Sequence, residues 1–245
     1  MYYPKNIYRR TSTPFICGLD LGKSQDYTAL VLMERIDRAG PWNATFWAYD
    51  VESTLVVRSI HRFPLGTPYT DIVQDVKRLM HEPNLFERTQ LVVDATGVGS
   101  AVIEMIDRAR TRAELTAVTI TGGDRATKDS WRASVPKKDL VSALAVMLQR
   151  EWLHVPRSGP FADLLMKEMT NFRVRYTGTG NQTFEAWRDR DHDDLVLAMA
   201  LACWKATSQW REFNDEMAPG PRDVPRGTVL DGRFSTTAQV PLVWW

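Results

Sequence analysis

A carboxylate placed directly after an apolar strand is the feature that most constrains this chain. Residues 15–20 form an apolar run that ends in Asp20, and a polar turn over 22–26 leads into a second apolar run over 28–33. Two apolar runs joined by a short polar turn predict a β-hairpin. A charge at the end of a buried strand costs free energy unless a partner compensates it. We therefore interpret Asp20 as the first ligand of a metal site completed by residues further along the chain.

The rest of the chain alternates between strand and helix patterns. A third strand over 44–53, after a turn at 38–41, completes an antiparallel meander, and the later strands and helices predict parallel pairing through crossovers. The predicted helices are 69–80, 100–112, 139–150, 161–169 and 195–206, and the predicted later strands are 91–94, 115–120 and 152–155, with a second hairpin formed by 172–176 and 183–187. The prediction is an α/β fold with a mixed five-stranded sheet of order 3-2-1-4-5, flanked by helices, with an added β-hairpin.

Further carboxylates occupy the ends of other predicted elements. Asp94 ends a short buried strand, and Asp193 and Asp194 precede the last apolar helix. In the order 3-2-1-4-5 the first and fourth strands are neighbours, so Asp20 and Asp94 meet at a topological switch point. A helix packed across that edge could add Asp194 and Asp193. Oxygen ligands suit Mg²⁺ or Mn²⁺, and two such ions activate water and stabilise the leaving oxygen in phosphodiester cleavage.

Each of these carboxylates also has a structural interpretation when taken alone. Either Asp193 or Asp194 would serve as the N-cap of the last helix. Asp94 would cap the following helix or close a turn, and Asp20 would be a turn aspartate. Only the combination, with each residue at the end of an element, favours a metal site.

Two glycine-rich segments resemble phosphate-binding loops, but neither has the glycine spacing that its motif requires. Three residues separate Gly18 from Gly22 before Lys23, where a P-loop requires four, and a turn and strand follow in place of a helix. The segment 97–99 opens a helix after a strand, but Val102 stands where a dinucleotide-binding loop has its third glycine.

Length and composition predict one large globular domain with a tail. The chain has 245 residues, of which 44% are hydrophobic, and its net charge of +1 gives no overall signal for nucleic acid. Residues 125–190 are locally basic, with twelve Lys or Arg against seven Asp or Glu, which alone would indicate a solvated surface. We expect an N-terminal arm over 1–13, a domain over 14–207 and an irregular tail over 208–245.

The chain carries no signal for secretion or membrane insertion that we can identify. Its N-terminus lacks an apolar core segment, and no apolar stretch approaches the length of a bilayer span. The two cysteines, Cys17 and Cys203, lie in apolar runs and are expected to be reduced core residues of a cytosolic protein.

Four sequence blocks resemble the nuclease domain of the large terminase subunits of tailed phages. They occur in the order found in that family, and the resemblance spans roughly residues 14–207. The blocks are GLDLGKSQDYTA at 18–29, LVVDATGVG at 91–99, VPKKDLVSA at 135–143 and HDDLVLA at 192–198.

This resemblance implies an RNase H-like fold related to RuvC resolvases and retroviral integrases. It implies two-metal cleavage of DNA, with Asp20, Asp94 and Asp194 as catalytic ligands of two Mg²⁺ or Mn²⁺ ions and Asp193 as a fourth ligand. The segment 172–187 would be the family's mobile β-hairpin. Full-length large terminases also carry a packaging ATPase, whose Walker motif is not found here. The chain is therefore expected to be an isolated nuclease domain, a split gene product or a nuclease-only relative.

The leading hypothesis is a metal-dependent endonuclease that cuts concatemeric phage DNA in the cytoplasm of the bacterial host. Its partners would be double-stranded DNA and a packaging ATPase, portal or small terminase subunit, and no membrane is involved. The residues expected to contact DNA phosphates are basic: Lys23, Lys128, Arg132, Lys137, Lys138, Arg173 and Arg175.

Two other functions remain open at this point. Actin-like phosphotransferases or ATPases also open with a strand, an Asp-x-Gly and a hairpin, although 245 residues hardly accommodate their two lobes. A nuclease-like fold could also serve as a catalytically silent docking module of a packaging machine, although the acidic positions that a nuclease needs are all present.

Overall fold

A mixed β-sheet forms the centre of the molecule. The computed structural model describes residues 13–22, 26–43, 48–178 and 193–217. Its sheet has eight strands in the order β6-β7-β5-β4-β1-β2-β3-β8. The strands are β1 Phe15–Asp20, β2 Ala29–Asn43, β3 Ala48–Arg62, β4 Thr89–Asp94, β5 Glu114–Thr121, β6 Thr127–Asp129, β7 Arg132–Pro136 and β8 Leu153–His154.

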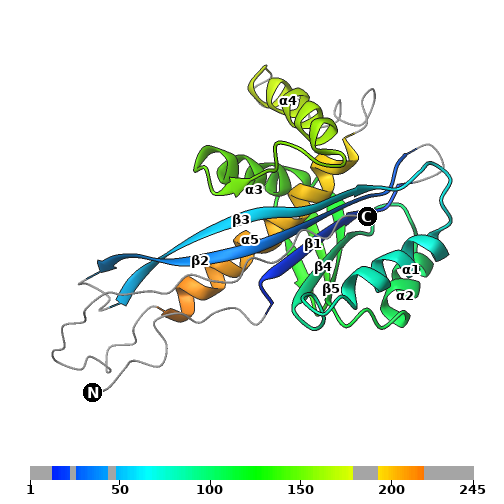
Figure 1. Cartoon of the computed structure of the whole chain (residues 1–245), viewed down its shortest axis with the longest axis horizontal. Helices are drawn as coiled ribbons and strands as arrows, with labels where there is room; N and C mark the ends of the chain where they lie inside the picture. Colours follow the sequence, from blue (N-terminus) through cyan, green and yellow to red (C-terminus); the bar gives the residue numbers. More distant parts are fainter. Residues whose placement is uncertain (1–12, 23–25, 44–47, 179–192, 218–245) are drawn as a thin grey trace.

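Strand directions follow from the connections. Strand β2 pairs antiparallel with both β1 and β3. The pairs β1–β4, β4–β5 and β5–β7 are parallel. The predicted order 3-2-1-4-5 is therefore confirmed as the centre of the sheet. In Figure 1, β2 and β3 continue beyond their neighbours as a long two-stranded ribbon.

Helices cover both faces of the sheet. They are α1 Tyr69–Met80, α2 Ser100–Arg108, α3 Lys137–Gln149, α4 Ala162–Gly178 and α5 Asp194–Met217. Residues of α3, α4 and α5 share one buried apolar cluster with one face of the sheet, and residues of α1 and α2 share a second cluster with the other face. None of the helices in the described part of the chain is long and apolar enough to cross a membrane.

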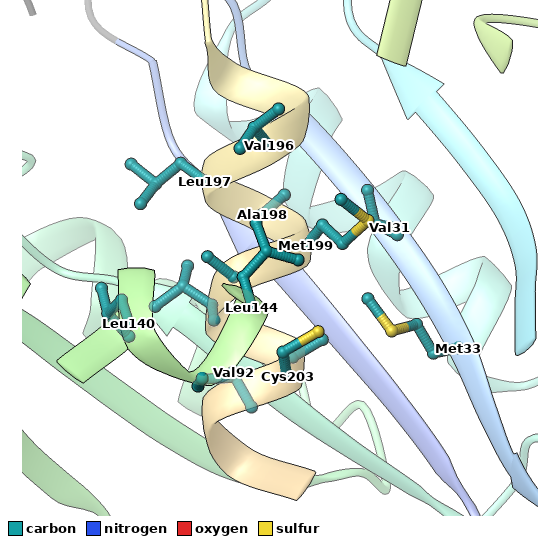
Figure 2. Close-up of a cluster of buried hydrophobic side chains, with 14 of the residues drawn as sticks. Val31, Met33, Val92, Leu140, Leu144, Val196, Leu197, Ala198, Met199 and Cys203 are labelled. Carbon is teal, nitrogen blue, oxygen red and sulfur yellow. The ribbon is translucent and has the colours of Figure 1, made fainter. Parts of the chain in front are cut away.

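Helix α5 packs closely against the centre of the sheet. Its buried residues Val196, Ala198 and Cys203 lie in the same cluster as Val31 of β2 and Val92 of β4 (Figure 2). At Gly18 of β1 a Cβ atom would overlap the carbonyl oxygen of Ala198, so only glycine allows this approach. Cys17 and Cys203 are buried and form no disulfide, as expected of core residues.

Several local predictions were wrong. Residues 38–41 were predicted to form a turn, yet they lie within β2, where the register with β3 shifts between Ala39 and Trp42. The segment 172–176, predicted as the first strand of a second hairpin, lies in helix α4, and most of that hairpin's remainder falls outside the described residues. Helix α5 continues to Met217, into the predicted irregular tail.

Two short strands were not predicted at all. β6 and β7 lie beside β5, and β6 forms the edge of the sheet. Every residue of β6 is exposed, so its sequence carries no apolar alternation that could have indicated a strand.

Candidate active site

Asp20 and Asp94 end neighbouring parallel strands. Leu19 of β1 pairs with Val93 of β4, so the two aspartates occupy the next position along each strand. Gly18 and Val92, two positions before Asp20 and Asp94, lie toward α5. Because side chains alternate along a strand, both carboxylates are on that same face of the sheet. Asp20 is 8% exposed and Asp94 is 3% exposed. Two buried carboxylates thus lie at the same edge and on the same face of the sheet.

Arg62 connects the start of helix α5 to this edge. Asp20 pairs with Ala29 of β2, and Ala29 pairs with Arg62 at the end of β3, so these residues form one row across the sheet. A terminal nitrogen of Arg62 donates to Oδ2 of Asp194, the first residue of α5, over 2.9 Å, and both side chains are about nine-tenths buried. The guanidinium also lies 3.6 Å from the centre of the Tyr27 ring. The Asp194 carboxylate is therefore held beside the row that contains Asp20.

Glu168 of α4 is a further acidic residue at this place. Its Oε2 atom accepts hydrogen bonds from the backbone N–H groups of Leu195 at 3.1 Å and Val196 at 3.2 Å. Burial raises the pKa of the Glu168 carboxyl to about 7, and the charge of Asp194 raises it too, whereas the two hydrogen bonds and the charge of Arg62 act in the opposite direction.

Glu168 was not among the predicted site residues, although the sequence carries a signal for it. The residue follows Leu165 by three positions and precedes Met169 by one, so it lies on the apolar stripe of a predicted helix. Both apolar neighbours are buried in the core cluster. A carboxylate on a buried helical face requires hydrogen-bond donors, which here are the first free N–H groups of another helix.

Asp94 also closes the turn that follows its strand. Its Oδ1 atom accepts a hydrogen bond from the backbone N–H of Thr96 at 2.7 Å. The Thr96 hydroxyl in turn accepts a hydrogen bond from the Ile120 N–H at 2.7 Å, which ties this turn to β5. The structural role considered for Asp94 is therefore present, and it fixes the orientation of the carboxylate at the end of β4.

The acidic residues suit a hard divalent cation in their chemistry. Their donors are carboxylate oxygens, which Mg²⁺ and Mn²⁺ prefer. Among the residues that the structure describes, no three Asp, Glu, His or Cys side chains are close enough together to form a complete ion site. Asp20 and Asp94 lie at one edge and on one face of the sheet, as two ligands of one cation must. Asp194 or Asp193, at the start of α5, would supply the third ligand.

The predicted DNA-contacting residues are spread over several elements. β7 is parallel to β5 and ends at Pro136, so Lys137 and Lys138 begin α3 at the same edge of the sheet as Asp20 and Asp94. Lys138 donates to the exposed Asp124 carboxylate over 2.6 Å, which lowers the pKa of Asp124.

The other predicted DNA-contacting residues are not placed at the edge that carries Asp20 and Asp94 by the strand pairing. Lys128 and Arg132 are exposed on β6 and β7, with the Arg132 guanidinium 4.5 Å from the Trp131 ring centre. Arg173 and Arg175 belong to helix α4, not to a hairpin, and Lys23 lies outside the described residues.

Comparison with known proteins finds relatives of one kind. No family model matches the chain. The chain is 28% identical over 201 residues to "Terminase, large subunit" of Thermus virus P23-45 and 27% identical over 201 residues to the protein of the same name from Thermus phage G20c. Each alignment covers 82% of this chain but 32% of the relative, so the chain spans about a third of the length of these proteins.

Solved structures with a similar arrangement were also found. The large terminase nuclease of phage G20c aligns with a TM-score of 0.45 and 23% identity over 77% of this chain and 80% of that one. The human cytomegalovirus terminase nuclease domain gives a TM-score of 0.44 at 12% identity over 77% and 81%. Thermus thermophilus RuvC gives 0.35 at 11% identity over 81% and 96%. In sequence, the chain is similar to phage terminase large subunits along most of its own length, as its motifs predict.

Proposed function

We propose that this chain is a divalent-metal-dependent DNA endonuclease that cuts concatemeric viral DNA during phage genome packaging. The observation that supports this most is the shared edge of the sheet. Asp20 and Asp94 end neighbouring parallel strands on the α5 face, and Arg62 holds Asp194 beside the same row. The similarity to two phage terminase large subunits supports the packaging context.

The carboxylates have a defined role in this proposal. Asp20 and Asp94 would hold the cations, with Asp194 as the third catalytic ligand and Asp193 as the fourth. When bound, two Mg²⁺ or Mn²⁺ ions supply an activated water and stabilise the leaving oxygen of the phosphodiester. The chain contributes a fixed carboxylate at Asp94, through the Thr96 N–H, and a charge-balancing guanidinium at Arg62.

Basic residues near the same edge would bind the DNA backbone. Lys137 and Lys138 begin α3 at the end of β7, and their ammonium groups would contact phosphates without reading bases. The remaining members of this proposed surface are Lys23, Lys128, Arg132, Arg173 and Arg175. Its partners would be double-stranded DNA and a packaging ATPase, portal or small terminase subunit, in the cytoplasm of the host cell.

Plasmid cleavage tests this function directly. We expect the purified chain to nick or linearise supercoiled plasmid with Mg²⁺ or Mn²⁺ and to be inactive with EDTA. Asp20→Asn and Asp94→Asn should each abolish cleavage, and the amide oxygen introduced by Asp94→Asn can still accept the Thr96 hydrogen bond, so the fold should persist. Glu104→Gln, on the exposed surface of α2, is the matched control and should cut normally. Cleavage that survives either aspartate change would refute the assignment.

A second candidate function is a docking module of a packaging machine that does not cut DNA. The specific observation in its favour is that the described residues form no complete three-ligand ion site. This function predicts no metal-stimulated cleavage by the wild-type chain and tight binding to a portal or ATPase partner. The same plasmid assay therefore separates the two candidates.

A further inference from the structure

Glu168 contacts the helix that carries the proposed third ligand. It is 6% exposed, and its Oε2 atom accepts hydrogen bonds from the Leu195 and Val196 N–H groups. These are among the first N–H groups of α5, which have no acceptor within their own helix. A side chain from α4 thus caps α5 across 27 residues of sequence.

This cap fixes the backbone beside the proposed ligands. Asp194 immediately precedes Leu195, so the two hydrogen bonds to Glu168 determine the direction of the turn from which Asp193 and Asp194 project. The negative charge also interacts favourably with the positive end of the α5 dipole. A shorter side chain, or one without an acceptor, could not hold this turn in the same place.

Arg62 holds the same turn from the side of the sheet. Its guanidinium binds the Asp194 carboxylate, while Glu168 binds the backbone of the two following residues. The carboxylate and the backbone of one turn are therefore fixed separately, by β3 and by α4. Replacing a residue that orients a metal ligand typically lowers metal affinity by about 10- to 100-fold.

We propose that Glu168 is a positioning residue that orients the first turn of α5, and with it Asp193 and Asp194, for binding a divalent cation. The inference rests on the proposed function. It differs from a role as a direct ligand, in which the second oxygen of Glu168 would bind the ion. That atom, Oε1, is buried and has no hydrogen-bond partner among the described residues, so the experiment must separate the two roles.

Glu168→Gln and Glu168→Asp distinguish the two roles, because the two roles predict opposite orders of Mn²⁺ affinity for them. Glu168→Gln keeps the length and one acceptor oxygen but loses the charge, whereas Glu168→Asp keeps the charge but is one methylene shorter. A positioning residue predicts Mn²⁺ affinity within about twofold of wild type for Gln, and a loss of about 10- to 100-fold for Asp and for Ala. A direct ligand predicts the reverse order, with Asp retaining more affinity than Gln.

Calorimetric titration of the full chain with Mn²⁺ measures these affinities without relying on cleavage. Circular dichroism confirms folding, and if Glu168→Ala fails to fold, the order of Gln and Asp alone decides. Glu104→Ala makes the same chemical change at an exposed position and should bind Mn²⁺ like wild type.

The outcomes separate the inference from the function on which it rests. Unchanged affinity in both Glu168→Asp and Glu168→Ala, or Asp binding better than Gln, would overturn the positioning role. Wild-type protein that binds Mn²⁺ no better than Asp94→Asn would instead remove the proposed metal site, and the inference with it. If wild type binds and Asp94→Asn does not, the Glu168 variants test the positioning role alone.

Discussion

At the scale of single residues, the ion pair between Arg62 and Asp194 has the clearest consequences. Both side chains are about nine-tenths buried, and the Arg62 guanidinium also stacks on Tyr27. Removing one partner of a buried pair leaves an uncompensated charge, which typically costs about 3–5 kcal/mol. Loss of Arg62 alone would therefore destabilise the fold, in addition to releasing Asp194.

We expect Arg62→Gln to lower the free energy of unfolding by about 3 kcal/mol, measured by urea denaturation in EDTA. Arg108→Gln removes an arginine from an exposed pair with Glu104 within α2 and should change stability by less than about 0.5 kcal/mol. If the two variants were equally stable, the Arg62 pair would have no special role in the fold.

Glu168 predicts a specific pH dependence of stability. Its pKa is raised from 4.5 to about 7 in the folded protein, so the folded state binds more protons than the unfolded state between these values. The stability that this group contributes is fully present below about pH 4.5 and is lost as the pH rises through about 7, by at most about 3 kcal/mol. Without metal, the folded protein is thus less stable when Glu168 is ionised than when it is protonated.

Glu168→Gln should remove this part of the pH dependence, because its side chain does not ionise and can still accept the two N–H groups. Melting temperatures measured in EDTA between pH 5 and 8 should fall less for the variant than for wild type. Glu104→Gln should follow the wild-type curve. Identical slopes for wild type and Glu168→Gln would contradict the raised pKa.

At the scale of elements, the close packing of α5 on β1 determines how near the start of α5 comes to the edge of the sheet that carries Asp20 and Asp94. Gly18 allows this approach, because any side chain there would overlap the backbone of α5 at Ala198. We expect Gly18→Ala to destabilise the protein by at least about 1–3 kcal/mol in chemical denaturation. Gly122→Ala is the control, since a Cβ there meets nothing within 4 Å, and near-equal stability of the two variants would argue against the packing of α5 described here.

The sequence predicted the elements that carry strong periodic patterns. The apolar runs of β1 and β4 and the stripes of α1 and α3 lie close to their predicted positions, and the alternation of strands and helices predicted the parallel pairing. The strand β6 was missed because three exposed polar residues carry no pattern. The segment 172–176, FRVRY, alternates like a strand, but it continues the helix α4 that begins at Ala162.

The candidate site was predictable only in its backbone positions. Asp20, Asp94 and Asp194 could be predicted because each stands at an element boundary, where a change of pattern is visible. Arg62 and Glu168 could not be assigned to them, because their contacts depend on cross-strand register and on the packing of α4 against α5, and sequence spacing reveals neither.

At the scale of the whole molecule, DNA binding is expected to depend on charge. Net charge is only +1, so binding must come from a local surface rather than from the protein's overall field. Lys137 and Lys138 are candidates because they begin α3 at the edge that contains Asp20 and Asp94.

We expect binding of duplex DNA in EDTA, measured by fluorescence anisotropy, to weaken steeply with salt. Replacing both Lys137 and Lys138 by Ala should lower the slope of log K against log salt by about 1–2, because each phosphate contact contributes about 0.9. Lys77→Ala, on α1 at the opposite face of the sheet, is the control and should leave the slope unchanged. An unchanged slope in the double variant would place the DNA elsewhere.

In the proposed function, carboxylates from separate parts of the chain share divalent ions at one edge of the sheet. The most direct measurement is a crystal structure of the chain soaked in Mn²⁺, with the ions located by anomalous scattering. We expect manganese bound directly to carboxylate oxygens of Asp20 and Asp94, with Asp194 or Asp193 completing the site. Manganese found only at other positions, or none at this edge at millimolar concentration, would contradict it.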